Sequence, residues 1–240
     1  RNGFRSSTAV SYLKPAIGRP NLHVMTEAMV ERVLFKGTTA TGIRVIQKGA
    51  AKEVQATREV ILSAGAIQSP QILELSGIGD PAVLQKLGIR VLQSWPGVGE
   101  NLQDHIDHVQ SYISGSDSET LGISVRGTVR MAKGVHEWRK NRTGVIASSI
   151  AEAGAFVRSA ADVSIPDIQL VFVVAMVDDH GRKMHTSHGF SCHVEVLRPY
   201  SRGTVKLASA DPRVAPKIDP NFLADERDLN LLVKGVQLQM

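Results

Sequence analysis

The N-terminal part of the chain alternates between short apolar runs and polar turn residues, a pattern typical of a small antiparallel sheet. Apolar runs occupy Val30 to Phe35 and Thr41 to Gln47, and a shorter one runs from Glu53 to Ala56. Lys36-Gly37 and Lys48-Gly49 separate these runs, and glycine tolerates the positive φ that tight hairpin turns need. The pattern therefore predicts a β-meander.

Two further strands are predicted, one on each side of this meander. Asn21 to Thr26 alternates apolar and polar residues, as a half-buried strand does. Glu59 to Ser63 has contiguous apolar residues, which favours a strand in a sheet that is covered on both faces.

Two short helices with clear start and stop signals are expected next. The first spans Ser69 to Leu75, with a capping serine followed by proline at the first helical position, and Gly77 ends it. Asp80-Pro81 repeats this start, and Gly88 ends the second helix. Ile89 to Leu92 then has the character of a short strand.

The pattern changes after the loop from Trp95 to Asn101, which is rich in turn formers and which we expect to connect two domains. Val125 to Arg139 has helical spacing with a basic outer face, and Asp225 opens a final amphipathic helix. Polar loops separate the segments with strand character, so a second, antiparallel sheet is predicted. These segments are Asp107–Ser114, Ile168–Val174, Phe190–Leu197 and Thr204–Leu207.

Composition places the 240-residue chain among ordinary globular proteins, with 42% hydrophobic and 21% charged residues. The formal charge of +5 is mild and aromatic residues make up 5%, so a nucleic-acid-binding role receives little support. Cys192 is the one cysteine, which excludes an internal disulfide framework. No apolar stretch is long enough to span a bilayer. The chain starts without Met and ends within a predicted helix, so we interpret it as an internal part of a longer protein.

The glycine pairs do not form a phosphate-binding loop of their own. Gly77-Ile78-Gly79 begins a G-x-G-x-x-A match, but the dinucleotide fingerprint needs a strand before the glycines, and here a helix precedes them. Gly97-Val98-Gly99 has Leu102 at the third glycine position. A helix stop followed by a helix start is therefore the better interpretation of the first pair.

Other candidate chemistry is equally weak. His180, His185, His188, His193 and Cys192 cluster in the sequence, but their spacing matches no familiar zinc pattern, so loop polarity and core packing are preferred to a metal site. A serine hydrolase would need a G-x-S-x-G elbow, and the sequence has none. The pairs Asp104-His105 and Asp107-His108 are sequence neighbours, which do not face each other on regular structure.

One segment is informative. Gly65-Ala66-Ile67-Gln68-Ser69-Pro70-Gln71-Ile72-Leu73-Glu74-Leu75-Ser76-Gly77-Ile78-Gly79 resembles the second signature of the glucose-methanol-choline (GMC) flavoprotein oxidoreductases at every constrained position. Three more stretches resemble the family in the right order: Arg5–Ala9 through Leu22, Gly97–His105, and Arg198–Val205 with Asp219-Pro220. The later stretches are most similar to bacterial alcohol and choline dehydrogenases.

The resemblance implies an FAD cofactor and names candidate residues for it. Val30 corresponds to the strand position whose backbone contacts the adenine of FAD in the family. Ala64 and Gly65 end the strand beside the dinucleotide, where a small residue lets backbone and cofactor approach. An ordinary strand residue and an ordinary strand-to-helix turn are the competing interpretations of these positions. Glu152 matches an active-site glutamate of some relatives, with a solvated surface glutamate as the alternative.

The resemblance also implies what the chain lacks. The family's glycine-rich fingerprint lies upstream of Arg1 and its catalytic histidine lies downstream of Met240, so no catalytic residue is assigned here, and no metal is expected. The expected fold is α/β (α+β). Residues 1–104 form a partial FAD-binding, Rossmann-like domain, 105–220 an antiparallel-sheet substrate-binding domain, and 221–240 begin a helical region.

The implied activity is oxidation of a small-molecule alcohol by hydride transfer to flavin, by an enzyme of which this chain is an inactive part. The electron acceptor is left open. Two alternatives remain: a family lyase that keeps FAD without redox use, and a non-catalytic binding module. We expect a cytoplasmic protein, with peripheral attachment at the inner membrane left open because Val125 to Arg139 is basic and amphipathic.

Overall fold

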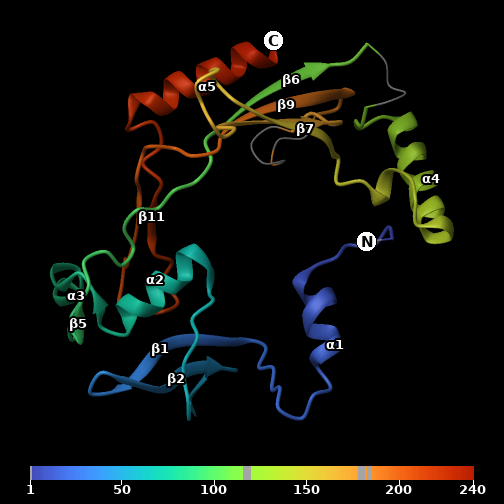
Figure 1. The fold of residues 1–240 in the computed structure, drawn as a ribbon. Helices are drawn as coiled ribbons and strands as arrows, with labels where there is room; N and C mark the ends of the chain where they lie inside the picture. Colours follow the sequence, from blue (N-terminus) through green and yellow to red (C-terminus); the bar gives the residue numbers. More distant parts are fainter. Residues whose placement is uncertain (1, 116–119, 178–181, 183–184) are drawn as a thin grey trace. The chain divides into compact units, whose positions relative to one another are not determined.

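The computed structural model describes residues 2–115, 120–177, 182 and 185–240, and the chain forms two compact units (Figure 1). The meander unit contains His23–Asp104 and Ser201–Ala224. The four-stranded unit contains the residues up to Leu22 together with His105–Tyr200 and Asp225–Met240. These units are composed differently from the expected domains, because residues 201–224 join the first segment and residues up to 22 join the second. Compactness does not reveal what a unit binds, so the expected roles stay predictions.

The predicted β-meander is confirmed as the three-stranded sheet of the meander unit. Strands β1 (Ala28–Lys36), β2 (Thr39–Gln47) and β3 (Ala50–Gln55) pair antiparallel in sequence order. Both turn glycines have positive φ, 62° at Gly37 and 79° at Gly49, as the hairpins require.

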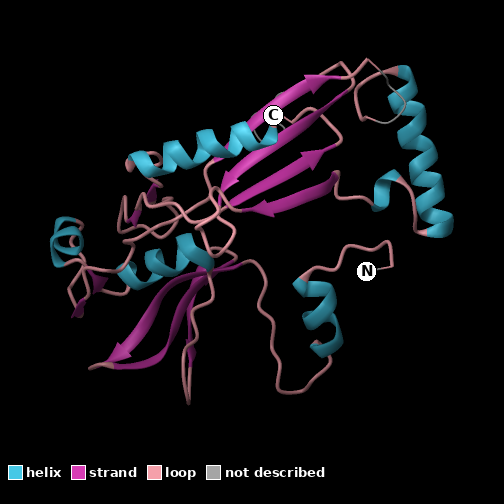
Figure 2. Cartoon of the chain, turned by 45° about the horizontal axis from the view of Figure 1, so that its top comes forward, coloured by secondary structure: helices cyan, strands magenta, loops and turns pink. Residues whose placement is uncertain are grey.

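Helix α2 (Gly65–Leu75) packs against β1 (Figure 2) and begins a full turn before the predicted start at Ser69. Pro70 therefore lies inside the helix, where it removes one backbone hydrogen bond but does not end it. The Ser69 hydroxyl accepts a hydrogen bond from the Ala64 backbone N–H at 3.1 Å, which explains why it looked like a cap.

The second predicted helix is confirmed as α3 (Pro81–Lys86), with the Asp80 carboxylate accepting from the Ala82 N–H at 2.8 Å. The expected strand at Ile89 to Leu92 is displaced: β4 (Ile78–Gly79) pairs parallel with β5 (Gln93–Ser94).

Two predicted strands are wrong. Asn21–Thr26 and Glu59–Ser63 have no strand assignment. A strand needs a hydrogen-bonded neighbouring strand, and in the described part of the chain neither segment has one. The apolar run at Glu59–Ser63 is not buried either, since Ile61 is 74% exposed.

The four-stranded unit is built on an antiparallel sheet of order β6-β9-β8-β7, which confirms the predicted second sheet. Its strands are β6 (Asp107–Ile113), β7 (Ala151–Val157), β8 (Ile168–Val173) and β9 (Gly189–Val196). The sequence pattern did not predict β7, whose Ala-Glu-Ala-Gly-Ala composition lacks strong strand formers. The predicted strand at Thr204–Leu207 belongs instead to the meander unit, where β10 (Thr204–Lys206) pairs with β11 (Lys217–Asp219).

Helix α5 (Glu226–Gln239) packs on β8 and β9 (Figure 2). Gly235 lets the helix approach, because a Cβ there would meet side-chain atoms of Val194 and Ile168. Those two residues are fully buried and form the centre of this core. Helix α4 (Val125–Asn141) is capped by Ser124, whose hydroxyl accepts from the Gly127 N–H at 2.9 Å.

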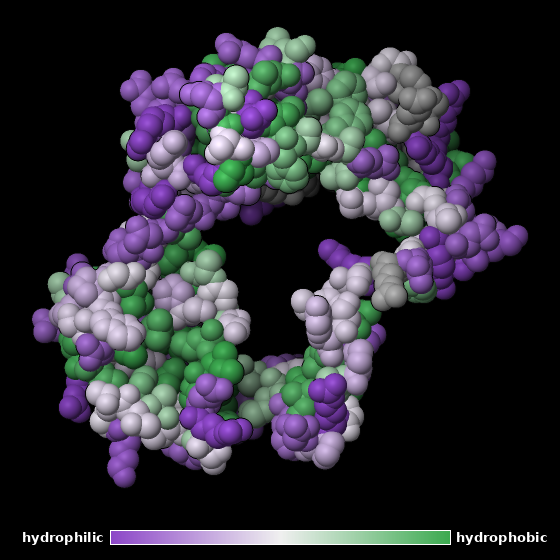
Figure 3. Space-filling view, viewed as in Figure 1, coloured by the Kyte–Doolittle hydropathy of each residue, from purple (hydrophilic) through white to green (hydrophobic). Residues whose placement is uncertain are grey.

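Shorter elements complete the unit: a π-helical turn at Ala9–Leu13, α1 (Lys14–Ala16) and a 3₁₀ turn at Val145–Ala147. Many hydrophobic side chains stay exposed on both units (Figure 3), including Ile113, Val125 and Phe156. Among the described residues, no helix has the length and apolar character needed to cross a membrane.

Candidate functional site

The start of β1 and one side of α2 border a cavity of about 500 Å³ in the meander unit. Two of the sequence-predicted cofactor residues, Val30 and Ala64, line it. The rest of its lining is mostly apolar, with two glutamines and one acid. These other residues are Glu27, Ala28, Met29, Gln68, Gln71, Ile72, Leu75 and Pro212.

The β1–β2 ladder is irregular beside this cavity. Val30 pairs with Val45 and Arg32 with Arg44, so Glu31 is an extra residue between them. Such a β-bulge bends the strand and leaves one residue outside the regular ladder, and bulges are frequent beside binding sites. The Arg44 guanidinium lies 3.0 Å from the Glu31 carboxylate, which anchors the bulged side chain.

Gly65 does not line the cavity, but its backbone has φ 83°, a conformation that disfavours every residue with a Cβ. A Cβ built there would meet no atom within 4 Å. Glycine is thus required at this position by the turn into α2, and the space beside it is open.

In the four-stranded unit, Glu152 is also the extra residue of a β-bulge. Ala151 pairs with Val173 and Ala153 with Phe172, so Glu152 stands outside the β7–β8 ladder. Its side chain is exposed, and its carboxylate accepts a hydrogen bond from the Ser148 hydroxyl at 2.7 Å. The carboxylate is therefore hydrated, oriented by one neighbour and accessible to a ligand.

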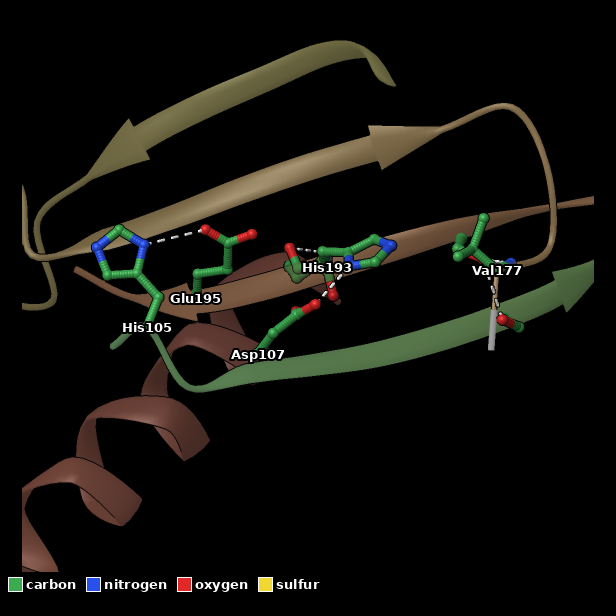
Figure 4. Close-up of polar contacts among 8 residues, drawn as sticks. His105, Asp107, Val177, His193 and Glu195 are labelled. Atoms are coloured by element: carbon green, nitrogen blue, oxygen red, sulfur yellow. Dashed lines mark hydrogen bonds and ion pairs between the residues drawn. The ribbon is translucent and has the colours of Figure 1, made fainter. Parts of the chain in front are cut away.

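Two polar pairs that the sequence did not predict join β9 to the start of β6 and to the loop just before it (Figure 4). His193 Nδ1 is 2.7 Å from an Asp107 carboxylate oxygen, and His105 Nδ1 is 3.5 Å from Glu195. Asp107, which the sequence sets beside His108, thus contacts a histidine of the neighbouring strand instead. Because 86 residues separate Asp107 from His193, only the strand register brings them together.

When the Asp107 carboxylate accepts this hydrogen bond, the proton of His193 is on Nδ1. In the neutral imidazole ring, Nε2 is then the atom that can accept a hydrogen bond. This Nε2 atom is buried and has no hydrogen-bond partner among the described residues. Nearer the start of β9, the Ser191 hydroxyl lies 3.0 Å from the Ser111 hydroxyl and accepts a hydrogen bond from the Val177 N–H at 2.9 Å.

The histidine cluster of the sequence does not form a common site in the described part of the chain. His188 is buried, with Nδ1 2.9 Å from the Thr120 carbonyl and Nε2 2.6 Å from the Ser124 hydroxyl, so it supports the start of α4. Burial raises the pKa of the Cys192 thiol. His180 lies outside the described residues. The described residues contain no group of three potential ligands suited to a metal ion.

Comparison with known proteins decides the family. The model described as GMC oxidoreductase, N-terminal part, matches residues 1–107, and the corresponding C-terminal model matches residues 199–239. The chain belongs to the GMC oxidoreductase family. The resemblance seen in residues 65–79 and in the three other stretches is thus confirmed.

Relatives and solved structures agree with this assignment. The chain is 38% identical to an alcohol dehydrogenase [acceptor] of Pseudomonas putida over 99% of this chain, and 43% identical to the mitochondrial choline dehydrogenase of Mus musculus over 98%. It spans 43% and 39% of those two proteins' lengths, about two fifths of each. The structure resembles that of a formate oxidase with a TM-score of 0.87 and 26% identity, covering 100% of this chain and 46% of the other. This GMC chain thus has the mixed helix-and-sheet fold of its family.

Proposed function

We propose that the protein containing this chain oxidises an alcohol to an aldehyde or ketone with FAD as cofactor. The observation that carries the proposal is the match of both GMC oxidoreductase models, at residues 1–107 and 199–239, together with relatives named alcohol and choline dehydrogenases. FAD modification is described for the structurally similar formate oxidase of Aspergillus oryzae, which agrees with this cofactor.

The meander unit would hold the adenosine end of FAD. Val30 lies beside a bulge and lines the cavity together with Ala64, and Gly65 keeps the following backbone free of side-chain bulk. A cavity of about 500 Å³ is within the range of small-molecule sites. The chemistry that bound FAD would supply is acceptance of a hydride from the alcohol. The residues named here bind and orient, and none of them is assigned a chemical step.

The four-stranded unit would hold the alcohol. Glu152 offers an accessible carboxylate held by Ser148, which suits a hydroxyl or a cationic group on the substrate. We assign the base that removes the hydroxyl proton to the family's histidine beyond Met240, and we therefore expect the 240-residue chain alone not to turn over alcohol.

The test is anaerobic mixing of the full-length flavoprotein with a panel of primary alcohols, neutral and cationic, while the flavin absorbance is followed. Bleaching of the oxidised flavin by at least one alcohol, with formation of the aldehyde, is the expected result. Flavin that stays oxidised while the alcohol is cleaved would instead indicate the lyase. A protein that retains no flavin would be a binding module, and the proposal would be wrong.

Peripheral membrane attachment is a separate expectation, supported by α4. Val125 and Val129 are exposed on the helix, and Lys133 and Lys140 are exposed there too. Cations beside exposed apolar groups suit an anionic bilayer surface. Sedimentation with vesicles that contain anionic lipid, but not with neutral vesicles, would support it; equal recovery in the supernatant of both would contradict it.

A further inference from the structure

Glu74, in the middle of the family signature, is completely buried in the meander unit. Its Oε2 atom accepts a hydrogen bond from the Leu207 backbone N–H at 2.9 Å, just beyond the end of β10. The other oxygen, Oε1, is buried without a hydrogen-bond partner among the described residues. A buried carboxylate is costly unless it is compensated, so the residues around it decide what it does.

Lys206 supplies the compensating charge. Its Nζ lies 4.0 Å from Glu74 Oε1 and 2.8 Å from the Glu100 carboxylate, and it donates a hydrogen bond to the Val98 carbonyl at 2.8 Å. One ammonium group thus connects helix α2, strand β10 and the turn at residues 98–100. Glu100 is partly exposed to solvent, whereas Glu74 is not. Opening of this cluster would therefore change the hydration of the Glu74 carboxylate more than that of the Glu100 carboxylate.

Gly79 and Gly99, to which the sequence assigned no phosphate-binding role, lie next to the Glu74 side chain. A Cβ at Gly79 would lie 3.1 Å from Glu74 Cγ. At Gly99, where φ is 73°, a Cβ would lie 3.6 Å from Glu74 Oε1 and would collide with the Val205 carbonyl oxygen. The Val205 N–H also donates a hydrogen bond to the Gly99 carbonyl at 2.7 Å. The glycines therefore leave room for a carboxylate and for the close approach of β10.

We propose that Glu74 is a positioning residue which, through Lys206 and Leu207, holds the 98–100 turn and β10 against α2. These three segments line a cavity of about 440 Å³ beside the first half of α2. Its residues are Ala66, Pro70, Gly99, Glu100, Asn101, Leu102, Gln103 and Val205. Assigning this cavity to part of the flavin site rests on the proposed function; the positioning role of Glu74 does not.

The charges that face Glu74 give this arrangement a pH dependence. Burial raises its pKa above the ordinary glutamate value, and Asp80 and Glu100 act in the same direction, while the Leu207 hydrogen bond and Lys206 oppose them. As the pH falls through this raised pKa, Glu74 becomes neutral and its attraction for Lys206 is lost. Neutral Glu74 also no longer carries a desolvation cost, and because its pKa is raised by burial, the closed arrangement binds this proton more tightly than an open, solvated one would.

Hydrogen exchange of the full-length protein tests this role, with the Leu207 and Val205 amides as reporters. Glu74→Gln keeps an oxygen that can accept from Leu207 but removes the charge that holds Lys206. We expect both amides to exchange about tenfold faster, comparable to weakening one charge-assisted hydrogen bond.

Lys206→Met is the second variant and leaves Glu74 intact. We expect it to accelerate Val205 exchange to the same extent, and the double variant to be no faster than either single variant, because the two residues act as one unit. Lys217→Met, an exposed lysine on the partner strand β11, is the matched control and should change neither amide.

Additive effects of the two variants, or acceleration in Glu74→Gln of Leu207 alone with Val205 unchanged, would overturn the positioning role. FAD retention is then measured on the same proteins. A protein without flavin would contradict the proposed function while leaving the exchange result intact. Flavin lost faster in both variants but not in Lys217→Met would place the cavity at the cofactor.

Discussion

The two units of this chain differ in the buried groups that hold their segments together. The four-stranded unit buries aliphatic side chains, such as Ile168, Val194 and Val196, between a sheet and one helix. The meander unit buries aliphatic side chains too, such as Val45 and Leu84, but its buried carboxylate, Glu74, faces a lysine and joins a helix, a strand and a glycine-containing turn. The buried carboxylate of the four-stranded unit, Asp228, accepts a hydrogen bond from the Tyr200 backbone N–H at 2.7 Å. Apolar packing tolerates small shifts, whereas a buried charge needs each partner at a fixed place.

Both units place a candidate ligand residue beside a β-bulge. Glu31 is the extra residue next to Val30 in the meander unit, and Glu152 is itself the extra residue in the four-stranded unit. Bulges break the ladder and redirect groups that a regular sheet would point elsewhere. The rigid parts of the units therefore differ, but their candidate sites are made in the same way.

We expect glycine substitutions to give the largest difference in unfolding free energy between the two units. We expect Gly99→Ala to cost about 4 kcal/mol of unfolding free energy, because the residue has φ 73° and the new Cβ meets the Val205 backbone. Gly235→Ala should cost about 2 kcal/mol, because its Cβ crowds the buried side chains of Val194 and Ile168 rather than backbone, and alanine favours the helix. Denaturant unfolding measures both. Equal costs would mean that the meander unit is no more constrained than the other.

Apolar truncation gives the next largest effect, in the four-stranded unit. Ile168→Ala removes a fully buried side chain and should cost about 3 kcal/mol. Ile61→Ala, in the wrongly predicted strand of the meander unit, removes a side chain that is 74% exposed and should cost less than about 0.5 kcal/mol. If Ile61→Ala proves as costly as Ile168→Ala in the full-length protein, another segment covers Glu59–Ser63 there.

Helix caps offer a finer comparison, since both units contain helices that are capped by a side chain. Ser124→Ala in the four-stranded unit loses the Gly127 hydrogen bond and the 2.6 Å contact with His188, so we expect about 1.5 kcal/mol of destabilisation. Asp80→Ala in the meander unit loses one capping bond and should cost about 1 kcal/mol or less. Thermal unfolding measures the two losses of stability, with Ser124→Asn as a control that keeps a capping side chain. A larger loss for Asp80→Ala than for Ser124→Ala would show that His188 contributes nothing to the cap.

We expect substitution of Glu152, at the β7 bulge, to have the smallest effect on stability. Its effect on substrate binding should be clear. Glu152→Gln should change the unfolding free energy by less than about 0.5 kcal/mol, since the residue is exposed. In the full-length enzyme its KM for alcohol should rise about tenfold, with kcat less affected, because a charged hydrogen-bond acceptor for the substrate is lost. Glu137→Gln, which removes a charge from α4, is the control. Unchanged kinetics at Glu152 would remove this residue from the site.

Local sequence signals predicted the elements whose determinants are neighbours in the chain. The hairpin glycines Gly37 and Gly49, the cap Asp80 and the strand run in β9 are cases in which a few adjacent residues decide the structure. Glu59–Ser63 shows the opposite: its apolar run resembles a buried strand, but pairing depends on a partner that the local pattern does not reveal.

The candidate sites depended on long-range pairing or on the family resemblance. Glu74 and Leu207 are 133 residues apart, and Asp107 and His193 are 86 apart, so no spacing rule could join them. Val30 was a candidate only through the family, because a backbone contact leaves no side-chain signature. The bulges beside Val30 and at Glu152 became visible only once the strand register was known.

The central claim, that the meander unit holds FAD beside Val30 and Ala64, is tested most directly by FAD affinity in the full-length protein. Ala64→Leu extends a side chain at the cavity wall, and Ala155→Leu makes the same change on β7 of the four-stranded unit. Equilibrium titration of the apoprotein with FAD should show at least about tenfold weaker binding for Ala64→Leu and unchanged binding for Ala155→Leu. Unchanged affinity in Ala64→Leu would contradict the placement of the cofactor in this cavity.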